Sequence, residues 1–404
     1  MSTALQPLSQ NNRDLTLDLL RGFALAGVLL TFCATDVGAG INYKNNLLDE
    51  IINWPKWLLI ENRMYTMLII IFGIGFHVQL QKAKQKDVSL VPAFTRRLIG
   101  LLLIGFAHAI LLSTRDVLMF YGIAGAFLLP MRNLSNRWLF LIMGIVFLVI
   151  VPAVAFVADG YQAFSLPKPN NYVEHLQHNW QFFKLYHQIY PIYCEMLFHF
   201  MLGFIISRAG ILQRIKADKK FRRSLLISSL IGTAILIPVY YFWVSNVING
   251  FFTSLPHLWQ KFLLSAGFRI LWQVWMLVSV TVYITVLISL WRTERGKKWL
   301  GPLVAFGQMT LSNYLIQSIV LVPYLLAFDK YDNLPPFNAF ILFLIVLALQ
   351  LVFSVWWMAR YSFGPFEWLL RSITYWKWQP IKKPVQKQFD DQKQLITVSS
   401  PRYL

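Results

Sequence analysis

Long apolar runs separated by short polar segments make up most of this chain. A helix needs about twenty mostly apolar residues to cross the hydrocarbon core of a membrane. Ten runs fit this pattern, at residues 17–35, 58–80, 97–114, 116–131, 138–158, 192–209, 224–245, 264–291, 303–327 and 336–360. The third and fourth are short and almost continuous, which predicts a tight helical hairpin. The pattern therefore predicts an all-α protein, a polytopic transmembrane helical bundle of about ten spans.

The composition supports a membrane location. Of the 404 residues, 57% are hydrophobic and 14% are charged, and the mean hydropathy is +0.52. Soluble domains are about 45–50% apolar and about 25% charged. A soluble chain of this size could not remove so much apolar surface from water. The composition therefore excludes the soluble, disordered and fibrous classes.

The net charge of +19 comes from 37 Lys and Arg against 18 Asp and Glu. In a soluble protein this excess would indicate nucleic-acid binding, but in a membrane protein Lys and Arg are retained on the cytoplasmic side. The loops after the second, fourth, sixth and eighth spans hold eighteen of them, the intervening loops seven and the C-terminal tail eight. This asymmetry predicts a multi-pass membrane protein with the even-numbered loops and both termini in the cytoplasm. We expect the basic loops to contact anionic lipid, not nucleic acid.

The segments outside the spans are short. Residues 1–16 form a predicted cytoplasmic N-terminal segment, 17–379 the transmembrane bundle, and 380–404 a polar basic tail. The first span has no convincing cleavage site, so we expect it to remain uncleaved. Cys33 and Cys194 cannot form a disulfide framework and show no metal-ligand spacing. Because no separate soluble domain is predicted, any chemistry belongs to the bundle.

Ionisable residues inside the spans are the candidates for function, because a charge at the centre of a membrane helix costs about 2.5–3.5 kcal/mol on insertion scales. Asp18 and Arg21 lie three residues apart at the start of the first span. One interpretation is an ion pair on one helix face. The other is that Arg21 faces a cavity and binds an anionic group such as a phosphate. Gly22 and Gly27 on the same span would let another helix approach closely.

His108 and Asp116 bracket the predicted hairpin between the third and fourth spans. A neutral imidazole close to a carboxylate is typical of a general base. In the structural alternative, the histidine caps a tight helical turn and Asp116 is the N-cap of the next helix. The residues alone leave both interpretations open.

Further polar residues lie in the outer half of the predicted bundle. Glu195 and His199 are four residues apart on one face of the sixth span, a spacing that is not the zinc pattern and favours a structural hydrogen bond. Arg269 needs a carboxylate or a ligand anion as its partner. On the ninth span, two amides one turn apart could bind across helices or line a cavity. Those amides and one arginine at the outer start of the second span complete the candidates for binding: Asn313, Gln317 and Arg63.

Four blocks of sequence stand out. They are LDLLRGFALAGVLL (17–30), RRLIGLLLIGFAHAILLSTRDVLMFYGIAG (96–125), GPLVAFGQMTLSNYLIQS (301–318) and FGPFEWLLRSITY (363–375). In content, order and spread they resemble the signature blocks of the YeiB family, bacterial integral membrane proteins that carry a domain of unknown function. This chain departs from the family pattern at Arg115, where glycine is usual, and at Gln308, where arginine is usual.

The YeiB family is similar to a larger superfamily of transmembrane acyltransferases, which take an acyl group from cytoplasmic acyl-CoA and acylate a saccharide on the far side. The resemblance implies an acyltransferase-like enzyme in which His108 deprotonates an acceptor hydroxyl and Asp116 orients it. The loop after the first span, residues 34–55, has no histidine, unlike the heparan-acetylating members. The residues expected to hold the acidic donor at a cytoplasmic mouth are Asp18, Arg21, Arg96 and Arg97.

Acyl-CoA is thus the expected co-substrate and a saccharide or other small molecule the expected acceptor, with no tightly bound cofactor and no metal. A rival hypothesis is a transporter or permease of a small solute, because buried charges on several helices also line substrate pathways. A third is a structural membrane protein without turnover. The amino-acid sequence does not specify an oligomeric state.

Overall fold

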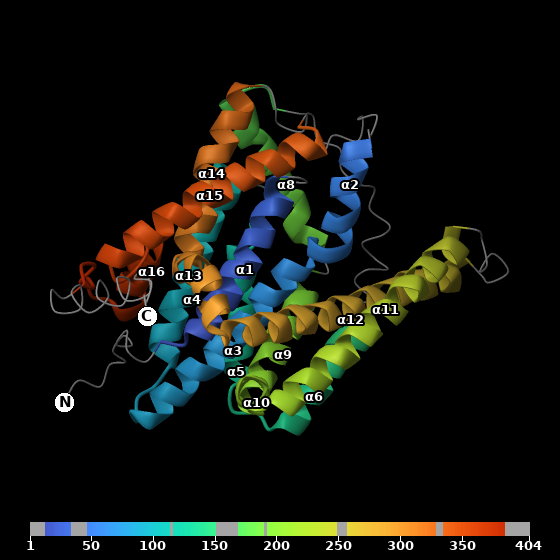
Figure 1. The fold of residues 1–404 in the computed structure, drawn as a ribbon, viewed down its shortest axis with the longest axis horizontal. Coiled ribbons are helices and arrows are strands. Elements are labelled where there is room, and N and C mark those ends of the chain that lie inside the picture. The colour runs from blue at the N-terminus through green and yellow to red at the C-terminus, as the bar shows by residue number, and fades with distance from the viewer. Residues whose placement is uncertain are drawn as a thin grey trace, which may run out of the picture.

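A computed structural model describes residues 13–33, 47–113, 116–150, 169–189, 192–248, 257–328 and 334–383. These residues form helices and no strand, which confirms the predicted all-α class (Figure 1). Two short π-helical turns, η3 and η4, continue the helices before them. The elements in chain order are α1 (Leu15–Thr31), α2 (Leu47–Pro55), η3 (Lys56–Ile60), α3 (Arg63–Gln85), α4 (Val91–Leu111), α5 (Leu118–Met131), α6 (Asn136–Ile145), η4 (Val146–Ile150), α8 (Tyr172–Ile189), α9 (Ile192–Arg208), α10 (Ile211–Ala217), α11 (Lys219–Ile248), α12 (His257–Trp291), α13 (Glu294–Gln308), α14 (Thr310–Ala327), α15 (Pro336–Arg360) and α16 (Pro365–Tyr375).

The long helices have the length and composition of membrane spans. Six stretches of the described residues pass this test, and the pair α9 and α10, bent by 58° relative to each other, would be a seventh if the two helices cross the membrane as one span. These helices indicate a membrane protein, and the count of ten spans stays a prediction. The six stretches that are long and apolar enough to cross a membrane are Leu47–Gln85, Val91–Leu111, Lys219–Phe242, Arg269–Trp291, Thr310–Ala327 and Pro336–Arg360.

The helix α1 lies in the middle of the bundle, in contact with α3, α13, α14 and α15 (Figure 1). The helix α4 packs against α5, as the predicted hairpin requires, and also against α16. The helices α11 and α12 lie side by side and extend away from the other helices (Figure 1). The first and last parts of the chain therefore meet around α1 and α4.

The contact between α1 and α13 is unusually close. A Cβ added to Gly22 would lie 2.0 Å from the carbonyl oxygen of Leu303, and one added to Gly307 would lie 1.8 Å from that of Asp18. Glycine is what allows two helix backbones to approach this closely. This confirms the close approach predicted at Gly22, and it places the end of α13 next to Asp18.

The predicted ninth span, 303–327, is not a single helix. The helix α13 ends at Gln308 and α14 begins at Thr310, with Met309 between them at φ −112° and ψ 34°. The apolar pattern continues through this point, so hydropathy does not reveal the break. A second helix N-terminus therefore lies inside the bundle.

A carboxylate from α16 binds this internal N-terminus. The amides of Leu311 and Ser312 donate to Oε1 of Glu367 at 2.6 and 3.2 Å, and the Ser312 hydroxyl donates to Oε2. The first amides of a helix lack intrahelical partners and favour a nearby negative charge, so Glu367 stabilises the break. The amide of Phe366 donates to Oγ of Ser312 at 3.0 Å, which fixes α16 against α14.

Candidate functional site

A cavity of about 360 Å³ lies between α1, α3, α4, α5, α14 and α16. Its charged mouth is at the end of the bundle that holds the N-terminal segment and the basic loop after α3, the side predicted to be cytoplasmic. The polar and charged residues that line the cavity are Arg13, Asp14, Asp18, Arg21, Gln79, Lys82, Lys86, Arg97, Gln308, Thr310, Glu367, Arg371 and Thr374.

The lining changes from charged to apolar along three helices. On α1 the change extends over ten residues, or about 15 Å at the rise of an α-helix. The cavity therefore suits a ligand with an anionic end at the mouth and an apolar end inside. Charged or polar lining residues are followed inward by apolar ones: Asp18 and Arg21, then Leu25 and Val28, on α1; Lys82 and Gln79, then Phe72 and Leu68, on α3; and Arg97, then Leu101, on α4. The apolar Leu17, Val78 and Ala93 on these helices also line the cavity.

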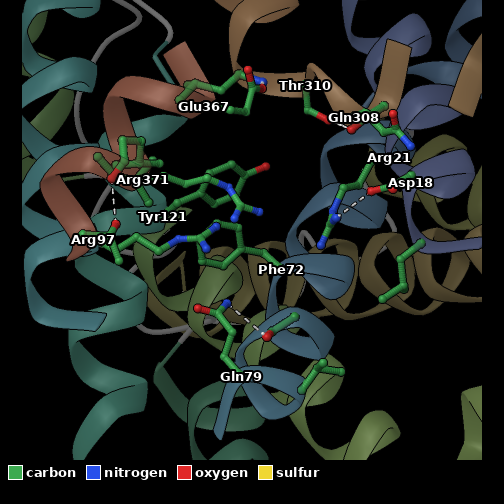
Figure 2. Close-up of a pocket in the computed structure, with 18 of the residues that line it drawn as sticks. Asp18, Arg21, Phe72, Gln79, Arg97, Tyr121, Gln308, Thr310, Glu367 and Arg371 are labelled. Atoms are coloured by element: carbon green, nitrogen blue, oxygen red, sulfur yellow. Dashed lines mark hydrogen bonds and ion pairs between the residues drawn. The ribbon is translucent and has the colours of Figure 1, made fainter. Parts of the chain in front are cut away.

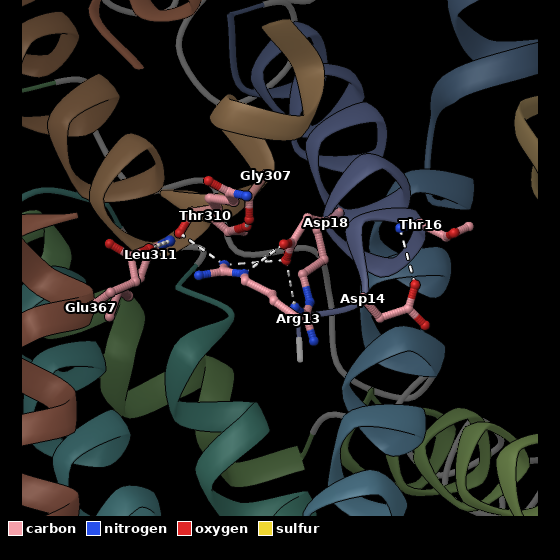
Figure 3. Close-up of polar contacts among 10 residues, drawn as sticks. Arg13, Asp14, Thr16, Asp18, Gly307, Thr310, Leu311 and Glu367 are labelled. Carbon is pink, nitrogen blue, oxygen red and sulfur yellow. Dashed lines mark hydrogen bonds and ion pairs between the residues drawn. The ribbon is translucent and has the colours of Figure 1, made fainter. Parts of the chain in front are cut away.

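Two arginines share the carboxylate of Asp18. Nε of Arg13 donates to it at 2.6 Å (Figure 3) and Nη1 of Arg21 at 3.1 Å (Figure 2), and Asp18 is 1% exposed. Arg13 also donates to the carbonyl of Gln308 at 3.5 Å, at the end of α13. Arg21 thus has both features raised by the two interpretations of its sequence position, because it pairs with Asp18 and also lines a cavity.

Arg97 and Arg371 reach into the cavity from the side opposite Arg21 (Figure 2). The guanidinium carbon of Arg97 lies 5.2 Å from the ring centre of Phe72, which stacks on Tyr121 with centroids 5.2 Å apart. Nε of Arg97 is buried and has no hydrogen-bond partner among the described residues. An aromatic face attracts a cation but does not neutralise its charge. The guanidinium of Arg97 can therefore still bind an anionic ligand.

The helix α16 follows the last predicted span and brings two charged groups to the cavity. Burial lowers the pKa of Arg371, and the positive charge of Arg13 acts in the same direction. Burial raises the pKa of Glu367 against the opposing effect of the hydrogen bonds from Ser312 and Leu311. Both shifts follow from the cost of keeping a charge away from water. A bound anion would offset that cost at Arg371.

His108, Asp116 and Ser318 form a buried chain of polar contacts, each at most 3% exposed. Nδ1 of His108 lies 2.9 Å from Oδ1 of Asp116, and Nε2 lies 2.9 Å from Oγ of Ser318. The histidine–carboxylate contact is close but is not aligned as a hydrogen bond. Oδ2 of Asp116 accepts from the amide of Met119 at 2.8 Å. Asp116 therefore both caps the first turn of α5 and faces the imidazole, which combines the two interpretations of its sequence position.

Tyr314 separates this chain of contacts from the cavity. The residue lines the cavity, and its ring packs against the imidazole of His108 with centroids 4.9 Å apart. Its hydroxyl accepts from the amide of Val117, another lining residue, at 3.4 Å. His108 and Ser318 do not line the cavity themselves. The ring of Tyr314 therefore contacts the imidazole directly, and the residue also lines the cavity.

Arg96 does not join Arg97 at the cavity. Its Nε donates to the carbonyl of Thr374 at 3.0 Å, and the residue is absent from the lining. Consecutive residues on a helix do not face the same side, so a shared role for the two arginines was geometrically excluded. The structure corrects that expectation, because Arg371 contributes the second guanidinium on this side.

Arg63 also lies away from the cavity. It is fully buried and its Nη1 donates to the carbonyls of Trp57 and Glu61 at 3.0 and 3.1 Å. Its guanidinium carbon lies 4.3 Å from the ring centre of Trp275. The residue therefore connects η3 to α12.

The remaining candidates make contacts between other helices. Arg269 has the carboxylate partner that its position required, with Nη1 3.0 Å from Oε1 of Glu195. Nδ2 of Asn313 donates to Oγ of Ser354 at 2.9 Å, across to α15. No group of three His, Cys, Asp or Glu side chains in the described residues could hold a metal ion. Seven of the candidate binding residues do not line the cavity: Arg63, Arg96, Glu195, His199, Arg269, Asn313 and Gln317.

Three residues of the site were missed by the sequence reasoning: Ser318, Glu367 and Arg371. A signal for them is present, because Ser318 ends the block 301–318 and the other two lie in the block 363–375, both of which resemble the family's signature blocks. The structure brings these two blocks together at the break between α13 and α14.

Comparison with known proteins finds a family model over part of the chain and relatives over nearly all of it. Residues 206–377 match the family described as "Protein of unknown function (DUF418)". The chain is 27% identical to the uncharacterized protein YxaH of Bacillus subtilis (strain 168), over 94% of this chain and 99% of that protein. It is 23% identical to the uncharacterized protein YeiB of Escherichia coli (strain K12), over 90% of this chain and 96% of that protein. These matches support a YeiB-family protein of unknown function. No solved structure matches it.

The site combines both halves of the chain. Ser318 and Arg371 lie inside the region matched by the family description, whereas Arg21, Arg97 and His108 precede it. The relatives match over nearly the full length, so both parts of the site fall within the similar region. Of the two departures from the family pattern, Gln308 lines the cavity and Arg115 lies outside the described residues.

Proposed function

We propose that this protein is an inner-membrane enzyme of the acyltransferase type. It takes an acyl group from a cytoplasmic acyl-CoA-type donor and transfers it to a hydroxyl group of an acceptor at the outer side. The observation that carries the proposal is the position of His108 and Asp116 beside the inner end of a cationic cavity, with the ring of Tyr314 between them. The distribution of Lys and Arg supports a cytoplasmic position for the mouth of this cavity.

The cavity suits a long amphipathic anion. Its volume of about 360 Å³ falls within the range of about 300–1,000 Å³ typical of small-molecule sites. Arg21, Arg97 and Arg371 present guanidinium groups, which match the geometry of phosphate oxygens. The apolar inner lining accommodates the pantetheine arm and the acyl chain. A donor bound in this direction carries its thioester towards Tyr314.

The imidazole of His108 has the partners of a general base. The carboxylate of Asp116, 2.9 Å from Nδ1, favours the tautomer with hydrogen on Nδ1, so Nε2, which lies 2.9 Å from Oγ of Ser318, is the ring nitrogen that can accept a proton. Nε2 removes the proton from the attacking hydroxyl as that oxygen bonds to the thioester carbonyl carbon. The carbon–sulfur bond then breaks, and the leaving thiolate takes the proton from His108. The buried setting strengthens the electrostatic effect of Asp116 on each step.

Inverted membrane vesicles that contain the full chain test this proposal with acetyl-CoA labelled in the acetyl group. The wild-type protein is expected to release free thiol and to transfer label to non-protein material of the vesicles. His108→Gln should lower both rates by a factor on the order of 10² to 10⁴, the usual contribution of a general base. A transporter, the rival hypothesis, would release no thiol.

The matched control is His77→Gln. His77 is buried and its Nδ1 lies 2.9 Å from Oγ of Ser207, but it neither lines the cavity nor belongs to the chain of contacts at His108. This variant should keep the wild-type rates. Equal losses in the two variants, or unchanged transfer in His108→Gln, would contradict the proposal.

A further inference from the structure

Two buried histidine–serine pairs in this bundle can be compared. Nδ1 of His77 lies 2.9 Å from Oγ of Ser207, between α3 and α9, and Nε2 of His108 lies 2.9 Å from Oγ of Ser318, between α4 and α14. The second pair has a carboxylate behind the imidazole, with Asp116 2.9 Å from the other ring nitrogen. The charged groups that act on His77 are cations. The second pair therefore has a partner that a purely structural contact between helices does not need.

The contacts of Ser318 direct its proton towards the imidazole. Asp116 favours hydrogen on Nδ1 of His108, so Nε2 is an acceptor for the serine hydroxyl at 2.9 Å. The second acceptor of that hydroxyl, the carbonyl of Tyr314, is 3.4 Å away. Carboxylate, imidazole and hydroxyl in this order are the arrangement that activates a serine nucleophile, whatever the fold.

Ser318 also lies at a suitable depth. Tyr314 lines the cavity, and Ser318 follows it by one turn of α14, about 6 Å further along the helix axis. In the proposed function the donor arrives from the cytoplasmic side and the acceptor from the outer side. A side chain between the two can hold the acyl group while the partners exchange. Access from the cavity requires the ring of Tyr314 to turn aside.

We propose that Ser318 is a covalent carrier, which receives the acyl group of a thioester donor as an ester before the group reaches the acceptor. The inference rests on the proposed function and adds an acylation site to it. In the first step a bond forms between Oγ of Ser318 and the acyl carbon, and the carbon–sulfur bond breaks. The Oγ proton passes to Nε2 of His108 and then to the thiolate, which leaves as a free thiol.

The second step returns the serine to its starting state. An acceptor hydroxyl attacks the ester carbonyl carbon, and its proton passes to Nε2 of His108. The bond between the acyl carbon and Oγ breaks, and Ser318 recovers the proton from the imidazole. Donor and acceptor are the only reactants, so both steps balance without an oxidant or a reductant.

The test uses the full-length protein in lipid nanodiscs, mixed with acetyl-CoA labelled in the acetyl group and with no acceptor. The wild-type protein is expected to release a burst of free thiol approaching one per protein and to retain label on the peptide that contains Ser318, as located by mass spectrometry. Ser318→Ala should not retain label, and its initial rate of thiol release should be lower by a factor on the order of 100 or more, as expected when a nucleophile is removed. Ser207→Ala, which removes the serine that contacts His77, should retain the wild-type label and the wild-type burst of thiol.

A second variant guards against misfolding. Ser318→Cys should still be labelled, now as a thioester that neutral hydroxylamine removes, whereas the wild-type ester resists the same treatment. Label or a full burst in Ser318→Ala, or label on another residue, overturns the inference. If the protein releases thiol continuously in the presence of membranes and Ser318→Ala does so at the wild-type rate, Ser318 is not a covalent carrier and the proposed function stands. If the wild type releases no thiol from acetyl-CoA with or without membranes, both are wrong.

Discussion

At the scale of single residues, positive charge around the cavity exceeds negative charge. Arg13 and Arg21 share the one carboxylate of Asp18, and Glu367 is engaged by the N-terminus of α14. Arg97 has an aromatic ring as its neighbour in place of a carboxylate. A buried charge without an opposite partner is costly. The excess of guanidinium groups therefore supports the proposed binding of an anionic donor in this cavity.

Glu367 provides a prediction about pH. Burial raises its pKa above the ordinary value of 4.5, so the folded protein binds this proton more tightly than the unfolded chain does. The stabilisation of the folded state by the protonated form of Glu367 is therefore complete below pH 4.5, and it is lost as the pH rises through the folded-state pKa of this residue. Glu367→Gln should remove this part of the pH dependence of the thermal unfolding midpoint in detergent.

The control for this measurement is Glu294→Gln, because Glu294 is exposed on α13 and pairs with Lys297 on the surface. That variant should keep the wild-type profile between pH 4 and pH 8. A Glu367→Gln profile that still falls with rising pH as steeply as the wild-type profile would show that another group is responsible.

The sequence identifies Asp18, Arg21 and His108 because an ionisable residue inside an apolar run is visible in one dimension. Ser318 is not visible in this way, since a serine is neutral and common in membrane helices. Arg371 follows the last span, where a basic residue is expected as a loop charge. Their roles depend on contacts with residues far away in the chain, which hydropathy does not report.

At the scale of elements, the break between α13 and α14 organises the site. It creates an internal helix N-terminus that Glu367 binds, and this contact holds α16 where Arg371 reaches the cavity. The apolar run 303–327 predicts one continuous span, and the reason for the break lies more than fifty residues further on, at Glu367. The helices themselves follow from the sequence, whereas this interruption follows from tertiary contact.

The close contact between α1 and α13 provides a prediction about stability. Gly22→Ala would place a Cβ 2.0 Å from the carbonyl oxygen of Leu303, so the helices must separate. The free energy of unfolding should fall by about 1–3 kcal/mol, the usual cost of overpacking. Denaturant titration in mixed micelles measures this change.

Gly301→Ala is the matched substitution on α13, where an added Cβ meets nothing within 4 Å. It should leave the free energy of unfolding unchanged or raise it by up to about 1 kcal/mol, because alanine favours a helix more than glycine does. Equal effects of the two substitutions would contradict the close contact.

At the scale of the whole molecule, the cavity joins the two ends of the chain. Arg13 contacts the carbonyl of Gln308, and His108 contacts Ser318, across almost three hundred and more than two hundred residues of sequence. The charge gradient along α1, α3 and α4 points from the basic loops towards Tyr314. The molecule thus has one charged entrance, an apolar interior and a buried histidine beyond it, the order that transfer from a cytoplasmic donor requires.

The central claim is that this cavity binds the acyl donor, and the neighbouring arginines of α4 test it most directly. Arg97 lines the cavity, whereas Arg96 does not and instead donates to the carbonyl of Thr374. Loss of one charge-assisted contact costs about 1.5–3 kcal/mol, which corresponds to about a ten- to hundredfold change in affinity. Equilibrium binding of acetyl-CoA to the protein in nanodiscs should therefore weaken by that factor in Arg97→Gln and stay at the wild-type value in Arg96→Gln. Equal affinities in the two variants, or weaker binding in Arg96→Gln than in Arg97→Gln, would contradict the account.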